Sequence, residues 1–181
     1  MRIGRSTWHR RLAIIGLGAS LAIGIASVAS AGGAIHASAT MRDATGAALG
    51  WAKFTEDASG TLHVTVHVKG MSPGLHGIHI HAVGDCDPFG AAGSHLNAGG
   101  QFHGLANTLG SPHAGDLPNL RVNGAGVGQL AAVSDRAGLS ASSILDGDGS
   151  ALVIHLLPDD QSSQPIGGSG DRIACGEIEA D

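Results

Sequence analysis

The chain is poor in aromatic and in basic residues. Its 181 residues include no tyrosine, three phenylalanines and two tryptophans. A dimer interface anchored by aromatic side chains, which are enriched in such interfaces, is therefore not evident. Lysine and arginine together number 10, against 15 acidic residues. Nucleic-acid-binding proteins need clustered basic residues, so this balance argues against a nucleic-acid partner.

Helical patterning is absent as well. The sequence holds 30 glycines and no 3.6-residue apolar period, so helices of any length are not expected. From Thr61 to Lys69 apolar and polar residues alternate instead, as on a half-buried strand. Further strands are expected over residues 34–41, 47–55, the segment around His79, 120–122, 128–134, 151–156 and 173–178. With two long irregular stretches, 84–116 and 158–171, the pattern predicts an all-β sandwich or barrel of about eight strands.

The N-terminus has the pattern of an export signal. Four arginines precede an apolar run over residues 12–28, which ends at the small-residue motif Ala29-Ser30-Ala31. We predict a secretory signal peptide over residues 1–31 and one domain over residues 32–181. The alternatives are cleavage at a second Ala-x-Ala at 37–39, a twin-arginine route, or an uncleaved anchor. The processed chain is expected outside the cytoplasm without a stable membrane span; it keeps 6 of the 10 basic residues, for a charge of 6 − 15 = −9.

The chain has two cysteines, Cys86 and Cys175. An oxidising compartment permits a disulfide between them, and two free thiols are the alternative. Such a bridge would close a loop of roughly 90 residues, which the chain-entropy model values at about 4–5 kcal/mol at most. Neither cysteine lies near the signal, which excludes a lipid anchor on cysteine.

Seven histidines and one aspartate in the middle of the chain have the spacing of a two-metal site. His79 and His81 alternate with two isoleucines, so a strand would direct both imidazoles to one face. Alone, such a pair is more often a core or surface pair than a pair of ligands. Imidazole suits copper and zinc, however, and a mixed nitrogen and carboxylate set suits zinc. The remaining candidates are His76, His95, His103, His113, His155 and Asp116.

Several separated motifs occur together in one order: Gly-Ile-His-Ile-His, Gly-Ser-His, His-Ala-Gly-Asp-Leu-Pro, Val-Ile-His and Gly-Asp-Arg-Ile-Ala-Cys-Gly. With them the chain resembles the copper,zinc superoxide dismutases in their bacterial exported form, from about residue 34 to residue 178. The resemblance implies a Greek-key sandwich or flattened barrel of antiparallel strands. It also implies the periplasm or the secreted fraction, and dismutation of superoxide to oxygen and hydrogen peroxide.

The resemblance also implies roles for individual residues. Redox-cycling copper would be bound by four histidines, and a structural zinc by three histidines and one aspartate, with one histidine shared. Asp159 would hydrogen-bond a ligand of each metal, and His76 would tie neighbouring loops together. Arg172 would bind the substrate, and Cys86 would pair with Cys175. The copper ligands would be His79, His81, His95 and His155, and the zinc ligands His95, His103, His113 and Asp116.

The sequence departs from the family around the expected substrate channel. Residues 158–171 contain three acidic residues and no lysine or arginine, and residues 86–95 contain Asp87 and no base. We therefore expect weaker electrostatic steering of superoxide than the family trait, and a flatter fall in rate with salt. Two other classes remain: a non-catalytic copper and zinc buffer of the same fold, and an interaction module. The oligomeric state, including a homodimer, stays open.

Overall fold

The computed structural model describes residues 35–97, 99–139 and 143–181. Within these ranges the only helix is a short 3-10 helix, η1 (Phe89–Ala92), so the all-β prediction is confirmed. None of the described helices is long and apolar enough to cross a membrane. The predicted signal peptide over residues 1–31 lies outside the described residues. The strands are β1 (Ile35–Arg42), β2 (Ala48–Glu56), β3 (Leu62–Val68), β4 (Gly74–His76), β5 (Ile78–His81), β6 (Leu120–Val122), β7 (Gly128–Ser134), β8 (Ser150–His155) and β9 (Arg172–Ala180).

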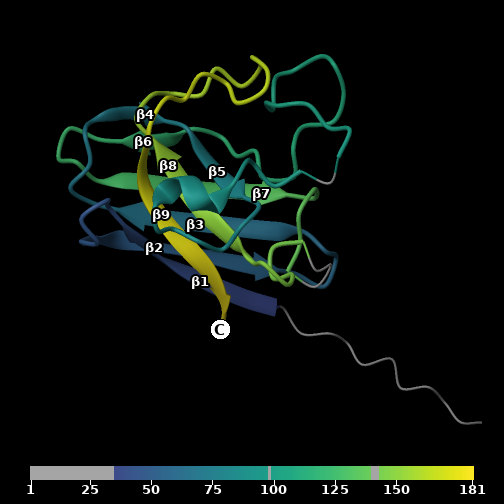
Figure 1. Cartoon of the computed structure of the whole chain (residues 1–181), viewed down its shortest axis with the longest axis horizontal. Helices are drawn as coiled ribbons and strands as arrows, with labels where there is room; N and C mark the ends of the chain where they lie inside the picture. Colours follow the sequence, from purple (N-terminus) through teal and green to yellow (C-terminus); the bar gives the residue numbers. More distant parts are fainter. Residues whose placement is uncertain (1–34, 98, 140–142) are drawn as a thin grey trace, which may run out of the picture. The chain divides into compact units, whose positions relative to one another are not determined.

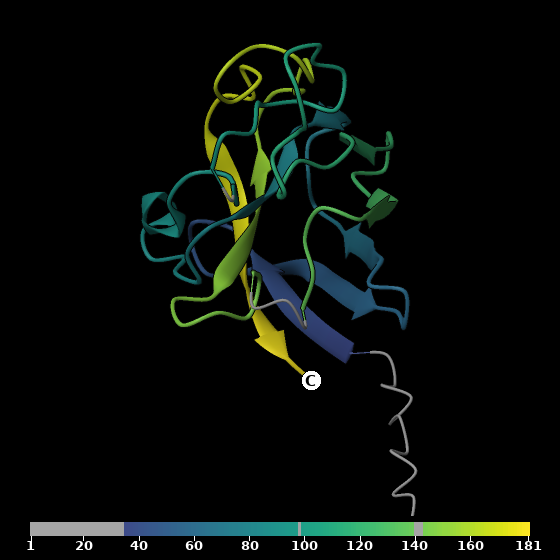
Figure 2. The same ribbon diagram turned by 90° about the vertical axis from the view of Figure 1, so that its right-hand side faces the viewer.

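These strands form one antiparallel sheet in the order β4-β6-β7-β3-β2-β1-β9-β8-β5. The sheet curls into a nearly closed barrel; the second long loop lies at one end of it, and the first long loop runs along its side to the same end (Figures 1 and 2). The two edge strands, β4 and β5, are separated in the chain by Gly77 alone. The chain therefore passes from one edge of the sheet to the other at this residue, and the barrel is closed there by the covalent backbone.

Sequence patterning predicts one strand around His79, whereas the structure has two. β4 pairs with β6, and β5 pairs with β8, so the pairing partner changes at Gly77. The carbonyl oxygen of Gly77 accepts a hydrogen bond from His155 N (2.8 Å), and its amide donates to Leu157 O (2.8 Å). A Cβ at this position would lie 2.5 Å from Ser169 Oγ, so the crossing requires glycine. His76 and His79 consequently belong to different edges of the sheet.

Side-chain alternation explains the core. On β3 the apolar residues are buried, and their polar neighbours point outward. β5 and β8 differ, because every residue of both strands is buried. Ile78, Ile80 and Ile154 face the barrel interior and join the main hydrophobic core. The opposite face of these two strands carries histidines, and the long loops cover it.

The first long loop is fastened to β5 through its main chain. Ile80 N donates to Gly115 O (2.9 Å), and Ile80 O accepts from Leu96 N (2.8 Å). Leu96 O in turn accepts from Gly115 N (2.9 Å). These bonds give irregular backbone a fixed position over the histidine face of the barrel.

Candidate metal centre

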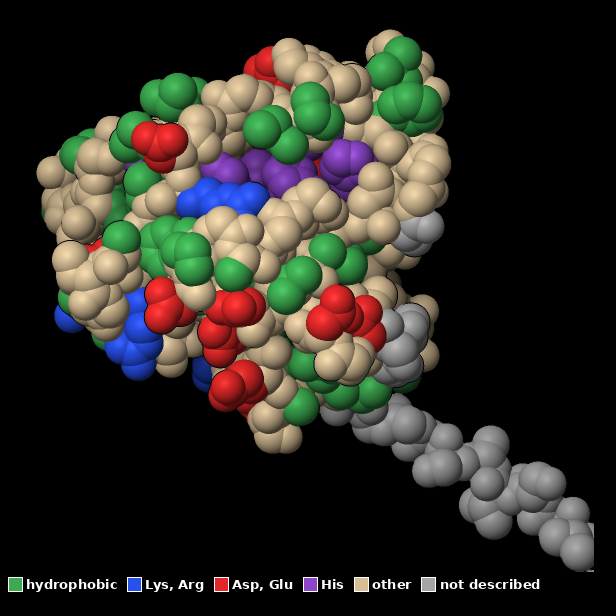
Figure 3. All heavy atoms as spheres, viewed as in Figure 1, with side chains coloured by type: hydrophobic (Ala, Val, Ile, Leu, Met, Phe, Trp, Pro, Cys, Tyr) green, Lys and Arg blue, Asp and Glu red, His purple; other side chains and the backbone are tan. Residues whose placement is uncertain are grey.

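The first cluster of histidines lies on the outer face of β5 and β8. His79 and His81 point the same way from β5, His155 does so from the end of β8, and His95 comes from the covering loop. All four are buried, and their ligand nitrogens lie within 4.8 Å of one another. Figure 3 shows histidine side chains at the floor of a surface hollow with a basic side chain beside them. The cluster is therefore screened from bulk water but open to a small solute.

Outer hydrogen bonds fix which nitrogen of each ring faces the cluster. The outward nitrogen of each ring donates its N–H to an acceptor oxygen. The inward nitrogen is then the unprotonated one and carries a free lone pair. These bonds join His79 Nε2 to Asp159 Oδ2 (2.5 Å), His81 Nδ1 to Gly93 O (2.9 Å) and His155 Nδ1 to Gly170 O (3.0 Å). The three inward nitrogens, which are His79 Nδ1, His81 Nε2 and His155 Nε2, are buried and have no hydrogen-bond partner. Such orphaned acceptors are costly unless something fills them.

The second cluster is centred on one oxygen of Asp116. Asp116 Oδ1 lies 3.0 Å from His95 Nδ1, 3.2 Å from His103 Nδ1 and 3.5 Å from His113 Nδ1. A tetrahedral zinc ion with bonds of about 2.0–2.1 Å separates its ligand atoms by about 3.3 Å. The three oxygen–nitrogen distances thus fit a tetrahedral zinc site, and all four atoms lie within 4.8 Å of one another. The other oxygen, Oδ2, accepts from Gly104 N (2.7 Å) and His113 N (3.1 Å), which orients the carboxylate.

His95 belongs to both clusters. Its Nδ1 faces Asp116 in the second cluster, which leaves Nε2, on the other side of the ring, for the first. The ring stacks on His79 with centroids 3.9 Å apart. An imidazole that has lost both N–H protons can bind two cations at once. The structure therefore brings together all the metal ligands expected from the sequence, with His95 as the shared member.

Asp159 connects the two clusters. One of its oxygens accepts from His79 Nε2 and the other accepts from His103 Nε2 (3.0 Å). All three side chains are completely buried. These three residues could also be taken as a metal group, but their spacing is that of direct hydrogen bonds. Asp160, the neighbouring carboxylate, instead accepts from the amides of Ser162 and Ser163 on the surface.

Burial decides the protonation of most of the rings. It lowers the pKa of His79 to about 4 and that of His81 to about 2, and it also lowers the pKa of His113 and His155. These rings are neutral at pH 7, which is the form that binds metals. His103 differs: burial acts against its protonation, but attraction to Asp116 and Asp159 outweighs burial and raises its pKa to about 9.

The two buried carboxylates are stabilised in their charged form. Burial acts to raise the pKa of Asp159, but hydrogen bonds from His103 and His79 outweigh it and hold that pKa below its ordinary value. The pKa of Asp116 is lowered against burial in the same way by His103 and His95. Both groups therefore carry a negative charge beside the histidine rings at pH 7.

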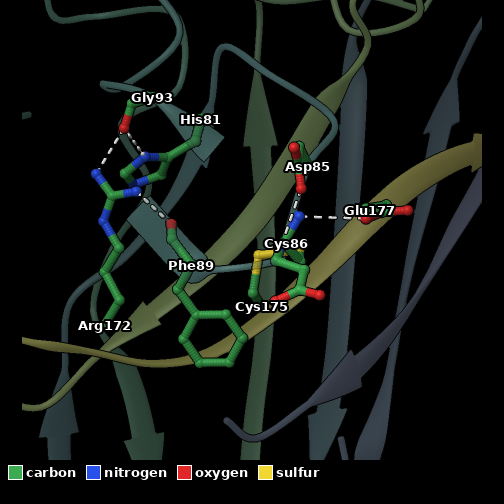
Figure 4. The surroundings of a disulfide bond; sticks show 9 residues. His81, Asp85, Cys86, Phe89, Gly93, Arg172, Cys175 and Glu177 are labelled. Atoms are coloured by element: carbon green, nitrogen blue, oxygen red, sulfur yellow. Dashed lines mark hydrogen bonds between the residues drawn. A yellow bond between two sulfur atoms is a disulfide. The ribbon is translucent and has the colours of Figure 1, made fainter. Parts of the chain in front are cut away.

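Arg172 lies at the edge of the first cluster. Its two terminal nitrogens donate to Phe89 O (2.6 Å) and Gly93 O (2.5 Å). Gly93 O also accepts the proton of His81 Nδ1, so one carbonyl fixes both side chains (Figure 4). Burial lowers the pKa of Arg172, but the ordinary pKa of a guanidinium is so high that the group stays cationic. A permanent positive charge is thus held next to the histidines.

The disulfide expected from the sequence is confirmed. Cys86 in the first long loop is bonded to Cys175 on β9, with Cα atoms 5.8 Å apart. Glu177, two residues further on β9, accepts from Cys86 N (3.2 Å) (Figure 4). The bridge therefore attaches the segment that contains Phe89 and Gly93 to β9, the strand that begins at Arg172.

His76 lies outside both clusters. Its Nδ1 donates to His155 O (2.8 Å), and its Nε2 lies 2.9 Å from Ser72 O. It thus joins β4 to the end of β8, next to the crossing at Gly77. Sequence reasoning missed the carbonyl groups of Gly93 and Gly170 that orient two of the rings. No side-chain pattern could have indicated them, because every residue has a carbonyl.

Comparison with known proteins agrees with this geometry. Residues 48–178 match the family described as copper/zinc superoxide dismutase. A superoxide dismutase [Cu-Zn] of Caulobacter vibrioides is 38% identical over 149 residues, covering 78% of this chain and 84% of that protein.

Two solved structures are also similar. The Cu/Zn superoxide dismutase from Brucella abortus has a TM-score of 0.67 at 31% identity, covering 80% of this chain and 99% of that one. A SOD-like protein from Bacillus subtilis has a TM-score of 0.72 at 34% identity, covering 77% of this chain and 96% of that one. This chain is a member of the copper/zinc superoxide dismutase family.

Proposed function

We propose that the protein dismutates superoxide to oxygen and hydrogen peroxide at a copper ion bound by the first cluster, with zinc in the second. Copper would be held by His79, His81, His95 and His155, and zinc by His95, His103, His113 and Asp116. The observation that carries the proposal is the set of five buried ring nitrogens without a hydrogen-bond partner, all of which belong to these clusters.

The donor atoms suit the two metals differently. Four nitrogens and no thiolate suit copper, whereas three nitrogens and one carboxylate oxygen at tetrahedral spacing suit zinc. When bound, copper supplies one-electron chemistry by alternating between Cu(II) and Cu(I), and zinc has no redox chemistry. The side chains around the hollow have to bind the anion and pass on one proton, and solvent supplies the second proton of hydrogen peroxide.

Arg172 provides the substrate-binding charge. Its guanidinium is cationic at every physiological pH and is fixed by two carbonyls. A small anion such as superoxide would be attracted to this charge and held beside the histidines. Binding at a fixed position also lowers the entropy cost of bringing the anion to the reacting centre.

His95 is the proposed proton carrier. Its Nδ1 is directed at Asp116, so Nε2 is the atom that can take up a proton and pass it to reduced superoxide. Asp159 keeps His79 and His103 oriented while this happens, because it accepts from both. His103, whose pKa is about 9 without metal, would lose a proton when zinc binds.

We also propose that residues 1–31 direct export, so that the enzyme works in the periplasm or outside the cell. The disulfide supports an oxidising compartment, since such bonds persist there and are rare in the cytosol. Incomplete processing would leave a longer N-terminus on protein recovered from cells. N-terminal sequencing of the exported protein tests the expected cleavage after Ala31.

The central test is superoxide dismutation by the purified protein loaded with copper and zinc. Arg172→Ala should lower the rate, and a copper-free sample should be inactive. Arg121→Ala is the matched control, because Arg121 is exposed on β6 and its side chain makes no hydrogen bond or ion pair within the described residues. Stoichiometric metal binding with a dismutation rate near that of a non-catalytic copper complex would identify the protein as a metal buffer instead.

A further inference from the structure

The irregular backbone that carries the zinc ligands is held by two side chains that are not themselves ligands. Arg136 follows the end of β7, and its side chain is 22% exposed. Its Nε donates to His113 O (3.3 Å), and its Nη2 donates to Asp116 O (3.0 Å). These carbonyls belong to the first and last residues of one turn, which is closed by Asp116 N donating to His113 O (3.3 Å). One guanidinium thus spans both ends of the turn that presents two zinc ligands.

A third ligand, His103, is held in the same manner by a side chain of the second long loop. The side-chain amide of Gln164 accepts from His103 N (2.8 Å) and donates to His103 O (2.9 Å). The pairing imitates one rung of a β-ladder between residues 61 positions apart. Both main-chain groups of His103 are satisfied by this single side chain. His103 needs such a partner because no strand runs through this part of the loop.

We propose that Arg136 and Gln164 are positioning residues of the zinc site, which hold the main chain of three ligands in the metal-binding arrangement. The inference rests on the proposed function, since it takes the second cluster to be the zinc site. These contacts are made by protein groups alone, so they can hold the ligands in place before zinc binds. Zinc binding therefore does not have to order the loop that carries them, and its affinity is not reduced by the corresponding loss of entropy.

The chemistry of the two side chains fits this role. The planar guanidinium of Arg136 presents several donors in a rigid fork, which can reach two carbonyls at once, whereas an ammonium group presents a single point. Among the residues that the structure describes, its only ion pair is a 3.7 Å contact with Asp135, whose side chain is 88% exposed, and a pair of that kind contributes little. The contacts to His113 and Asp116 are thus the main interactions of this side chain.

The test measures zinc affinity by competition with a chromophoric chelator. Arg136→Gln and Gln164→Ala are each expected to weaken zinc binding about 10- to 100-fold, the usual cost of losing a group that orients a metal ligand. Arg136→Lys should give a smaller loss, because lysine keeps the charge and loses the fork. The matched controls are Arg121→Gln and Gln129→Ala, which alter exposed residues of β6 and β7 and should leave zinc affinity unchanged.

Two further readouts separate positioning from general stability. Copper affinity of the first cluster and the unfolding temperature of the metal-free protein should both stay close to the parent values. The visible spectrum of Co²⁺ in the zinc site should change in Arg136→Gln, because it reports the tetrahedral geometry. Parental zinc affinity in both Arg136→Gln and Gln164→Ala would overturn the proposal, and so would equal losses of zinc and copper affinity.

The outcomes also distinguish this inference from the proposed function. A parent protein that binds no zinc stoichiometrically would contradict the assignment of the second cluster itself. If Arg136→Gln fails to fold, Arg136→Lys and Gln164→Ala decide the matter. Parental affinity in both of those variants would then contradict the proposal.

Discussion

A methyl group added at Gly167 should break the hydrogen bonding through Asp159 that links the first and second clusters of side chains. Gly167 has φ +66°, and a Cβ there would lie 2.0 Å from Asp159 Oδ1 and 2.4 Å from His103 Nε2. Those two atoms are hydrogen-bonded to each other at 3.0 Å, and both side chains are fully buried. Neither side chain has free space to retreat into, so Gly167→Ala has to displace the carboxylate from His103.

Its neighbour provides an almost ideal control. Gly168 has φ +67°, and a Cβ at this position meets nothing within 4 Å. Gly168→Ala should therefore cost only the left-handed backbone conformation, about 1–2 kcal/mol. Gly167→Ala carries the same backbone cost and also loses a hydrogen bond to a charged group, about 1.5–3 kcal/mol. The difference between the two variants isolates the contribution of the Asp159 contact.

The assay is chemical denaturation of both metal-free variants, followed by circular dichroism and extrapolated to zero denaturant. Gly167→Ala should be about 2 kcal/mol less stable than Gly168→Ala, which is the midpoint of the hydrogen-bond cost. Its affinity for zinc should fall about 10- to 100-fold, and Gly168→Ala should bind zinc normally. Equal stability and equal zinc affinity in the two variants would refute the reasoning.

Three other predictions concern charge, substrate binding and the disulfide. Dismutation should slow only weakly as ionic strength rises, because residues 86–95 and 158–171 contain no lysine or arginine; a steep loss in stopped-flow rates would contradict this. Arg172→Lys should be slower than the parent, since one ammonium cannot satisfy both Phe89 O and Gly93 O; parental activity would show that charge alone suffices. Cys86→Ser should lose about 2–5 kcal/mol of unfolding free energy, given that the cysteines are 89 positions apart; an unchanged denaturation midpoint would indicate a denatured state that is compact without the bridge.

Much of the site could be predicted from the sequence because its chemistry lies in side chains. The alternation over residues 61–69 reports a local property, namely which side of a strand each residue faces, and β3 is found there. The ligand types, their order along the chain and the single pair of cysteines are equally visible without coordinates. Asp159 could be preferred over Asp160 only through resemblance to a family, since both are aspartates in one loop.

The split between β4 and β5 could not be predicted in this way. Gly74 to His81 reads as one segment, and the pairing that divides it involves β6 on one side and β8 on the other. Strand pairing is set by contacts between residues far apart in the sequence. The only local trace is Gly77, one of 30 glycines.

The sequence by itself therefore determined the class of fold, the kinds of donor atom and the metals that they suit. Only the tertiary structure decided which nitrogen of His81 and of His155 points into the first cluster, because carbonyl groups of Gly93 and Gly170 impose that choice. It also decided that the side chains of Arg136 and Gln164 bond to the main chain of Asp116 and His103. Side-chain chemistry is written in the sequence, whereas every residue offers the same backbone groups, and folding alone selects which of them are used.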